Sequence, residues 1–140
     1  MIKYISFFVL LLMFSSCAKD SLNGVNKSLV LKQKLTLKVN ECVSNSTISM
    51  CVDSVNSDSR CPMDVVCIWQ GNAAVSVSLT LNETVHHITL NTGNTNALPA
   101  DTTIQQFKIS LTELAPYPVS TQTIIQDDYR ISLMVDELKD

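Results

Sequence analysis

Residues 73–90 read AAVSVSLTLNETVHHITL, and this stretch decides the fold class. Apolar side chains occupy every second position from Ala73 to Leu81, with small or hydroxylated residues between them. Such alternation is typical of a β-strand that buries one face and exposes the other. An Asn-Glu pair then interrupts the pattern, and a second strand is predicted over 84–90. The stretch therefore predicts two consecutive antiparallel strands.

The same alternation extends outward along the chain in both directions. Further alternating strands are predicted over 29–39, 48–52, 107–111 and 129–135. Residues 65–69 are continuously apolar, which predicts a strand covered on both sides, and longer irregular segments are expected over 91–101 and 115–118. About seven short strands without helical periodicity predict a single all-β domain, an antiparallel β-sandwich of immunoglobulin-like type. A small β-barrel remains the alternative.

The N-terminus reads MIKYISFFVLLLMFSSC and has the proportions of a signal peptide over residues 1–16. Its apolar run is too short to span a bilayer. Its end at Cys17 resembles the lipobox of bacterial lipoproteins, which implies lipidation (palmitate among the acyl chains) of that cysteine; an ordinary secretory signal is the alternative. Ala18 follows the cysteine, so the resemblance favours the outer membrane, on either its periplasmic or its surface face. Residues 17–27 are expected to be a flexible tether to a domain over 28–140.

The net charge and the hydropathy of the chain limit the classes of partner that can be expected. The chain carries ten basic and thirteen acidic residues, and removing residues 1–16 takes one lysine, which leaves a net charge of 9 − 13 = −4. Such a balance gives no basic footprint for nucleic acid. No later segment has the length of a transmembrane helix. The expected partners are therefore the membrane, through the lipid anchor, and an envelope or extracellular protein.

Four cysteines follow the proposed lipidation site, and an even number in a small exported domain favours disulfide bonds. Cys42 and Cys51 both fall on the solvent side of their strands, beside a single loop. That placement favours a bond between them across a hairpin, which leaves Cys61 to pair with Cys67. Zinc ligation is the alternative, but the spacings do not match those of zinc sites.

The segment DSRCPMDVVCIWQGNA, residues 58–73, resembles a signature of small, uncharacterised bacterial envelope lipoproteins. The resemblance implies export and a β-rich domain, and it implies no activity. From the residues themselves we expect Asp58 to accept hydrogen bonds from turn amides and Arg60 to bind a carboxylate or strand-end carbonyls. Trp69 is expected in the core, and Gly71 is expected to take a positive φ. Alternatively, Arg60 anchors an anionic ligand.

Other segments leave the function open. Tyr117 lies between two prolines, where it could form a contact surface or cap the sandwich. His86 and His87 are adjacent in a strand and point to opposite faces, so they do not suit a shared metal. Catalytic, phosphate-binding and dinucleotide motifs are absent from the sequence, so neither enzymatic activity nor a metal or other cofactor is expected. We expect a non-catalytic binding or structural accessory module; the alternative is an inhibitor of an extracellular hydrolase, a lysozyme or a protease.

Overall fold

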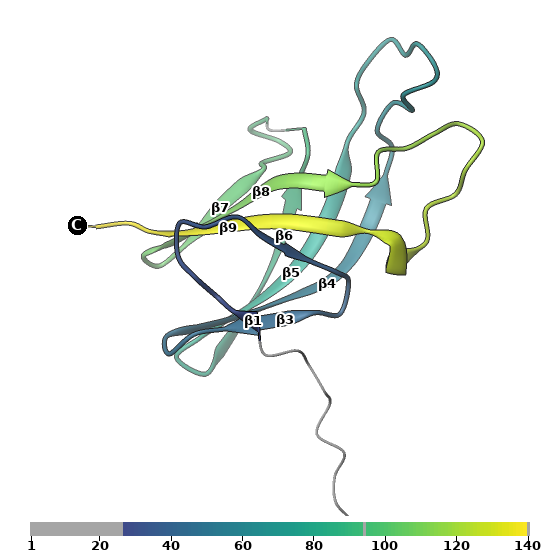
Figure 1. The fold of residues 1–140 in the computed structure, drawn as a ribbon. Helices are drawn as coiled ribbons and strands as arrows, with labels where there is room; N and C mark the ends of the chain where they lie inside the picture. Colours follow the sequence, from purple (N-terminus) through teal and green to yellow (C-terminus); the bar gives the residue numbers. More distant parts are fainter. Residues whose placement is uncertain (1–26, 94, 140) are drawn as a thin grey trace, which may run out of the picture.

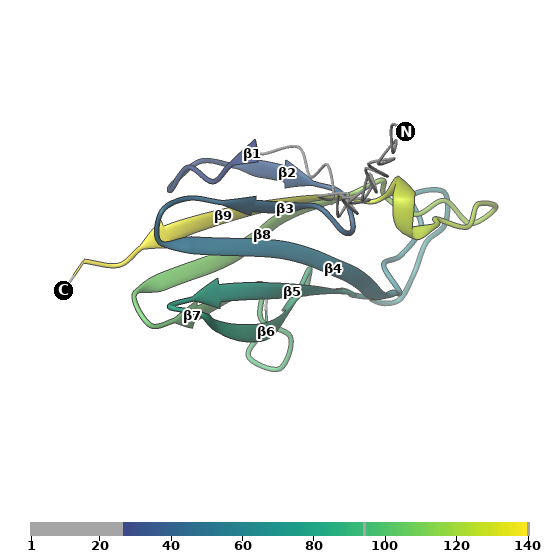
Figure 2. The same cartoon turned by 90° about the horizontal axis from the view of Figure 1, so that it is seen from below.

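The computed structural model describes residues 27–93 and 95–139, which form two β-sheets packed face to face (Figures 1 and 2). The sheets remain separate, so the predicted β-sandwich is confirmed and the barrel alternative is not. The predicted signal peptide, Cys17 and nearly all of the tether lie outside the described residues. Within the described part, no helix has the length and hydrophobicity that crossing a membrane requires.

The larger sheet has the strand order β1-β3-β4-β5-β6. Its strands are β1 (Lys27–Ser28), β3 (Cys42–Ser44), β4 (Ile48–Asp58), β5 (Ala73–Leu81) and β6 (Thr84–Asn91). Strands β3 to β6 follow one another in the chain as antiparallel neighbours, and only the short β1–β3 pair is parallel. The predicted hairpin over 73–90 is the β5–β6 pair, closed by Asn82 and Glu83, both with positive φ.

The smaller sheet has the order β2-β9-β8-β7. Its strands are β2 (Leu35–Leu37), β7 (Asp101–Ile104), β8 (Phe107–Ala115) and β9 (Arg130–Glu137), and a short 3-10 helix, η1 (Gln126–Asp128), precedes β9. Each sheet is thus built mainly from a meander of consecutive strands. This order differs from that of immunoglobulin domains, in which strands distant in sequence lie side by side more often.

The core lies between the sheets and follows from the alternation. Every second residue of β5, beginning with Ala73 and ending with Leu81, is buried, as are Phe107 and Ile109 of β8 and Ile131 and Leu133 of β9. The hydroxylated residues between them face outward. Burial of these branched and aromatic side chains supplies the main stabilisation of the sandwich.

Several predicted boundaries are wrong. The segment 29–39 is not one strand: only Leu35–Leu37 (β2) is extended, and the residues before it connect β1 of the larger sheet to β2 of the smaller one. Residues 65–69 form a turn and an irregular loop instead of a buried strand. Strands β3 and β7 were not predicted, since three or four residues are too few to show a period.

The two ends of β4 lie far apart and have different surroundings. Lys27, the first described residue, pairs with Val43, which pairs with Met50 near the start of β4. Asp58 ends β4, eight residues beyond Met50, or about 26 Å along an extended strand. The loop after Asp58 therefore projects from the end of the sandwich opposite Lys27 and β1 (Figure 1).

Candidate functional site

The chain that connects β4 to β5 begins as a continuation of their ladder. The amide of Ser59 donates to the carbonyl of Asn72 at 2.7 Å, and the amide of Cys61 donates to the carbonyl of Gln70 at 2.8 Å. Gly71 has a φ of +71°, and a Cβ there would lie 1.8 Å from the carbonyl oxygen of Ser59. The predicted positive φ is confirmed, and this close approach also requires glycine. The connection is therefore held in register at its base.

One disulfide bond closes the β4–β5 connection, and a second joins β3 to β4. Cys61 bonds to Cys67, with 5.9 Å between their Cα atoms, and closes a small ring. Cys42 bonds to Cys51 directly across the β3–β4 pair. Both pairings agree with the prediction. We call residues 61–70 the cysteine loop; because a disulfide and a backbone hydrogen bond both close it, its backbone has few accessible conformations.

The tip of the cysteine loop exposes apolar side chains. Val66 is fully exposed, Ile68 is 95% exposed and Trp69 is 76% exposed; Met63 also faces solvent. The prediction that Trp69 enters the core is wrong, because the ring formed by the disulfide carries the residues after Cys67 away from the sheets. Large apolar groups gathered on a constrained loop are typical of an interaction site.

A second loop, residues 116–126, lies against the cysteine loop. The amide of Met63 donates to the carbonyl of Pro118 at 3.0 Å, and the carboxylate of Asp64 accepts bonds from the amide and hydroxyl of Ser120. These bonds hold the pKa of Asp64 below its ordinary value. Asp64 is the only charged residue in 61–72 and 116–126. We call the exposed surface of these two loops the apolar end.

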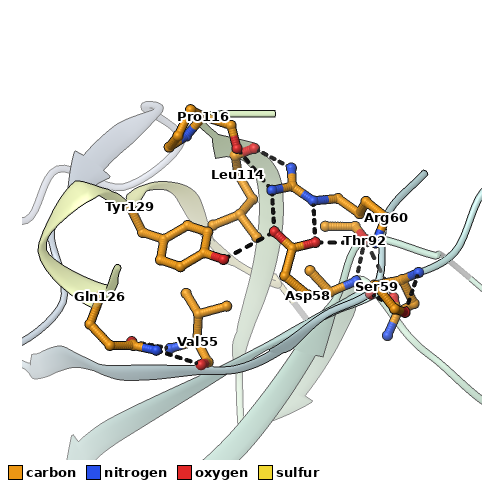
Figure 3. A network of polar contacts seen from close by, with 11 residues as sticks. Val55, Asp58, Ser59, Arg60, Thr92, Leu114, Pro116, Gln126 and Tyr129 are labelled. Carbon is orange, nitrogen blue, oxygen red and sulfur yellow. Dashed lines mark hydrogen bonds and ion pairs between the residues drawn. The ribbon is translucent and has the colours of Figure 1, made fainter. Parts of the chain in front are cut away.

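A buried network of polar groups lies where the two loops of the apolar end join the sheets (Figure 3). The guanidinium of Arg60 donates two bonds to the carboxylate of Asp58, one to the carbonyl of Leu114 at 2.6 Å and one to the carbonyl of Pro116 at 2.9 Å. The hydroxyl of Tyr129 donates to Asp58 at 3.1 Å. The network thus joins the end of β4, in one sheet, to the end of β8, in the other. Both predicted roles of Arg60, binding a carboxylate and strand-end carbonyls, are present.

The electrostatics of this network favour an ionised Asp58. Burial alone would raise its pKa, but the hydrogen bonds and positive charge of Arg60 and the bond from Tyr129 outweigh burial, so the pKa of Asp58 lies below its ordinary value. Burial, together with the negative charge of Asp58 and the bond to it, raises the pKa of Tyr129 to about 12. At neutral pH Asp58 is therefore ionised and Tyr129 is neutral.

The same region contains a shallow pocket of about 320 Å³, lined by Arg60, Gly71, Thr112 and Tyr117 among others. The ring of Tyr117 lies over the guanidinium, with its centroid 4.9 Å from Cζ, and is 42% exposed. Four of the five Arg60 N–H groups already have acceptors within the chain. Arg60 therefore supports the end of the sandwich, and Tyr117 both covers it and meets solvent.

Comparisons with protein-family models, curated proteins and solved structures find no match. The function is therefore inferred from the geometry of the site.

The sequence analysis did not predict a polar cluster that Asp53, Ser78 and His87 form in the larger sheet. The hydroxyl of Ser78 donates to Asp53 at 2.7 Å and lies 2.9 Å from Nδ1 of His87, on the outer face of the larger sheet. Asp53 lies at a β-bulge, and Cys51 is the residue opposite Ser78, so the contact of Asp53 with Ser78 could not be read from simple alternation. A Ser-His-Asp triad places histidine between the other two groups, whereas here serine is in the middle. The three groups therefore do not have the arrangement of that triad.

Metal ligation has little support in the described part of the chain. No three His, Cys, Asp or Glu side chains in residues 27–93 and 95–139 lie close enough to hold an ion. His86 and His87 point to opposite sides of β6, as predicted. His86 faces inward, where its Nε2 atom is buried without a hydrogen-bond partner in the described part of the chain.

Proposed function

We propose that this chain is a lipid-anchored, non-catalytic binding module of the bacterial cell envelope, and that the apolar end holds a partner protein. The observation that supports it is the exposure of Val66, Ile68 and Trp69 on a loop closed by a disulfide. Tryptophan is enriched among residues that dominate protein interfaces. Because the loop is already constrained, binding costs less conformational entropy than ordering a mobile segment would.

The point at which the chain enters the domain favours a protein, and not the anchoring membrane, as the partner of the apolar end. The chain enters the domain beside β3 at Lys27, whereas the cysteine loop lies beyond the opposite end of β4. An anchor on Cys17, ten residues before Lys27, could hold the domain up to about 35 Å from the lipid. The apolar end lies at the opposite end of β4 from that attachment point, so a second envelope or extracellular protein can reach it while the domain stays anchored.

Two experiments test the proposal. Replacing Cys17 with serine should release the protein from the membrane fraction; continued membrane association would contradict lipid anchoring. For the binding role, the chain from residue 18 is immobilised and incubated with native envelope proteins, and bound proteins are quantified. A specific partner should be lost with Trp69→Ala and retained with Leu138→Ala, which truncates an exposed apolar residue near the C-terminus. Equal retention by both variants would contradict binding through the apolar end.

An inhibitor of an extracellular hydrolase is the second candidate. The observation that favours it is the shape of the cysteine loop, which is closed by a disulfide bond and projects beyond the sheets (Figure 1). A loop that enters the active-site cleft of a hydrolase must project in this way. The test adds the chain from residue 18 to lysozyme and to a panel of proteases and measures residual activity. Inhibition that disappears with Trp69→Ala would establish this function, and unchanged activity of every enzyme would reject it for those hydrolases.

A further inference from the structure

The outer edge of β6 is the longest sheet edge in the described part of the chain. The strand at the edge of a sheet exposes unpaired backbone N–H and C=O groups. Proteins usually protect such edges by short strands, charges, proline or bulges. The other three edges of this sandwich are short: β1 has two residues, β2 has three and lies between Lys34 and Lys38, and β7 has four and begins at Asp101. Strand β6 has eight residues.

Strand β6 carries none of these protective features. Its sequence, TVHHITLN, has no lysine, arginine, acidic residue or proline. Its register with β5 is continuous over all eight residues, whereas the β4–β5 and β8–β9 pairs both contain shifts. In the described part of the chain β6 pairs with β5 alone and forms the outer edge of its sheet (Figure 2).

The direction of the backbone groups follows from one hydrogen bond. The amide of Asn91 donates to the carbonyl of Pro99 at 2.9 Å, so it points away from β5. Backbone groups alternate in direction along an antiparallel strand. Those of Val85, His87 and Thr89 therefore also point to the open edge, and the amide of Asn91 is the group on this side that the loop at Pro99 already satisfies.

We propose that two copies of this chain pair antiparallel along β6 and join their larger sheets into one. A two-fold axis beside His87 places that residue opposite its copy and Val85 opposite Thr89 of the other copy. Each such pair exchanges two backbone hydrogen bonds. The edge is self-complementary in this register: the β-branched side chains of Val85 and Thr89 meet on either side of the axis, and no Lys, Arg, Asp or Glu faces its copy. An uncharged edge of this kind matches a second copy of itself better than it matches a charged segment.

The strength of this pairing is expected to be low. Three residues from each copy contribute backbone bonds, and the contact is smaller than a standard protein interface. We therefore expect a monomer–dimer equilibrium with a dissociation constant in the micromolar range or weaker.

The register is tested with two matched double variants. Val85 and Thr89 lie about 13 Å apart on one strand, but the proposed axis brings each next to the other residue of the second copy. Val85→Lys with Thr89→Glu should therefore pair opposite charges, and Val85→Lys with Thr89→Lys should pair like charges. Sedimentation velocity measures the dissociation constant of each dimer, on the chain from residue 18, which contains the whole core and both disulfides. The Lys/Glu double variant should dimerise about ten-fold more tightly than the Lys/Lys double variant.

A third variant removes a backbone donor. Thr89→Pro deletes an N–H that points away from β5, so it should abolish dimerisation while a cooperative thermal transition persists. Ser44→Lys, at an exposed position of β3 and three strands away from β6, is the control and should not change association. Wild-type protein that stays monomeric at millimolar concentration would overturn the proposal. So would a dimer that is equally stable in both double variants, because its contact would lie elsewhere.

Discussion

Arg60 and Asp58 form an ion pair inside the sandwich, with 2.6 Å between Nη2 and Oδ2 and side chains only 5% and 9% exposed. Two residues apart in sequence, they gain their importance from what else they contact. Arg60 also binds the carbonyls of Leu114 and Pro116, and Asp58 accepts a bond from Tyr129. Because β4 and β8 belong to different sheets, this pair joins the sheets at the base of the apolar end.

Removing either partner should destabilise the domain strongly. Asp58→Asn leaves the buried charge of Arg60 without its counterion. Arg60→Met removes the guanidinium donors of Asp58 and of two carbonyls, and leaves the Asp58 carboxylate without a countercharge. Loss of one member of a buried pair typically costs about 3–5 kcal/mol. Chemical denaturation of each variant measures this loss in the free energy of unfolding.

The control is the exposed pair of Lys34 and Glu113. Lys34→Met should change the free energy of unfolding by no more than about 1 kcal/mol, since water screens an exposed pair. Equal effects of Lys34→Met and Arg60→Met would show that the Arg60 network contributes no more than a surface contact.

Tyr129 should resist ionisation at alkaline pH. Its pKa is raised to about 12 in the folded state, against about 10 in an unfolded chain. A raised pKa means that its stabilising contribution is complete below about pH 10 and is lost as the pH rises through about 12. After residues 1–16 are removed, the chain has two tyrosines, so the phenolate absorbance of wild type minus that of Tyr129→Phe isolates this group. A midpoint near the ordinary value would contradict the bond to Asp58.

Gly71 and Gly93 should respond very differently to alanine. A Cβ at Gly71 would lie 1.8 Å from the backbone oxygen of Ser59, and its φ is positive. We expect Gly71→Ala to cost more than about 2 kcal/mol, because backbone must move. At Gly93 the nearest atom is a side-chain oxygen of Asn72 at 3.2 Å, so Gly93→Ala should cost about 1 kcal/mol or less. Thermal unfolding compares them, and similar melting temperatures would show that the cysteine loop tolerates displacement at its base.

The parts of the fold that could be predicted are those in which apolar and polar residues alternate over a long run. Strand β5 and the hairpin to β6 were predicted almost to the residue, because nine alternating residues specify both the strand and its buried face. The disulfide pairs also followed, since Cys42 and Cys51 share the solvent side of neighbouring strands.

The parts that could not be predicted depend on contacts distant in sequence. Arg60 was identified as a fork for acceptors, but its carbonyl partners lie more than fifty residues away. Strand β7 is too short for a period, and the crossing from β1 to β2 depends on two sheets that alternation cannot assign. For 65–69, an apolar run was consistent with a buried strand, and the sequence did not show that the Cys61–Cys67 ring holds it in solvent.

Trp69 allows the exposure of the cysteine loop to be tested directly. It is the only tryptophan in the chain and is 76% exposed. Trp69→Ala should change the free energy of unfolding by no more than about 0.5 kcal/mol, whereas truncation of a buried tryptophan costs about 3–5 kcal/mol. Fluorescence provides a second measurement: the emission of the folded protein should already resemble that of the unfolded chain, and a soluble quencher should reach it. A blue-shifted, protected emission with a large loss of stability in Trp69→Ala would place the ring in the core and remove the basis for the apolar end.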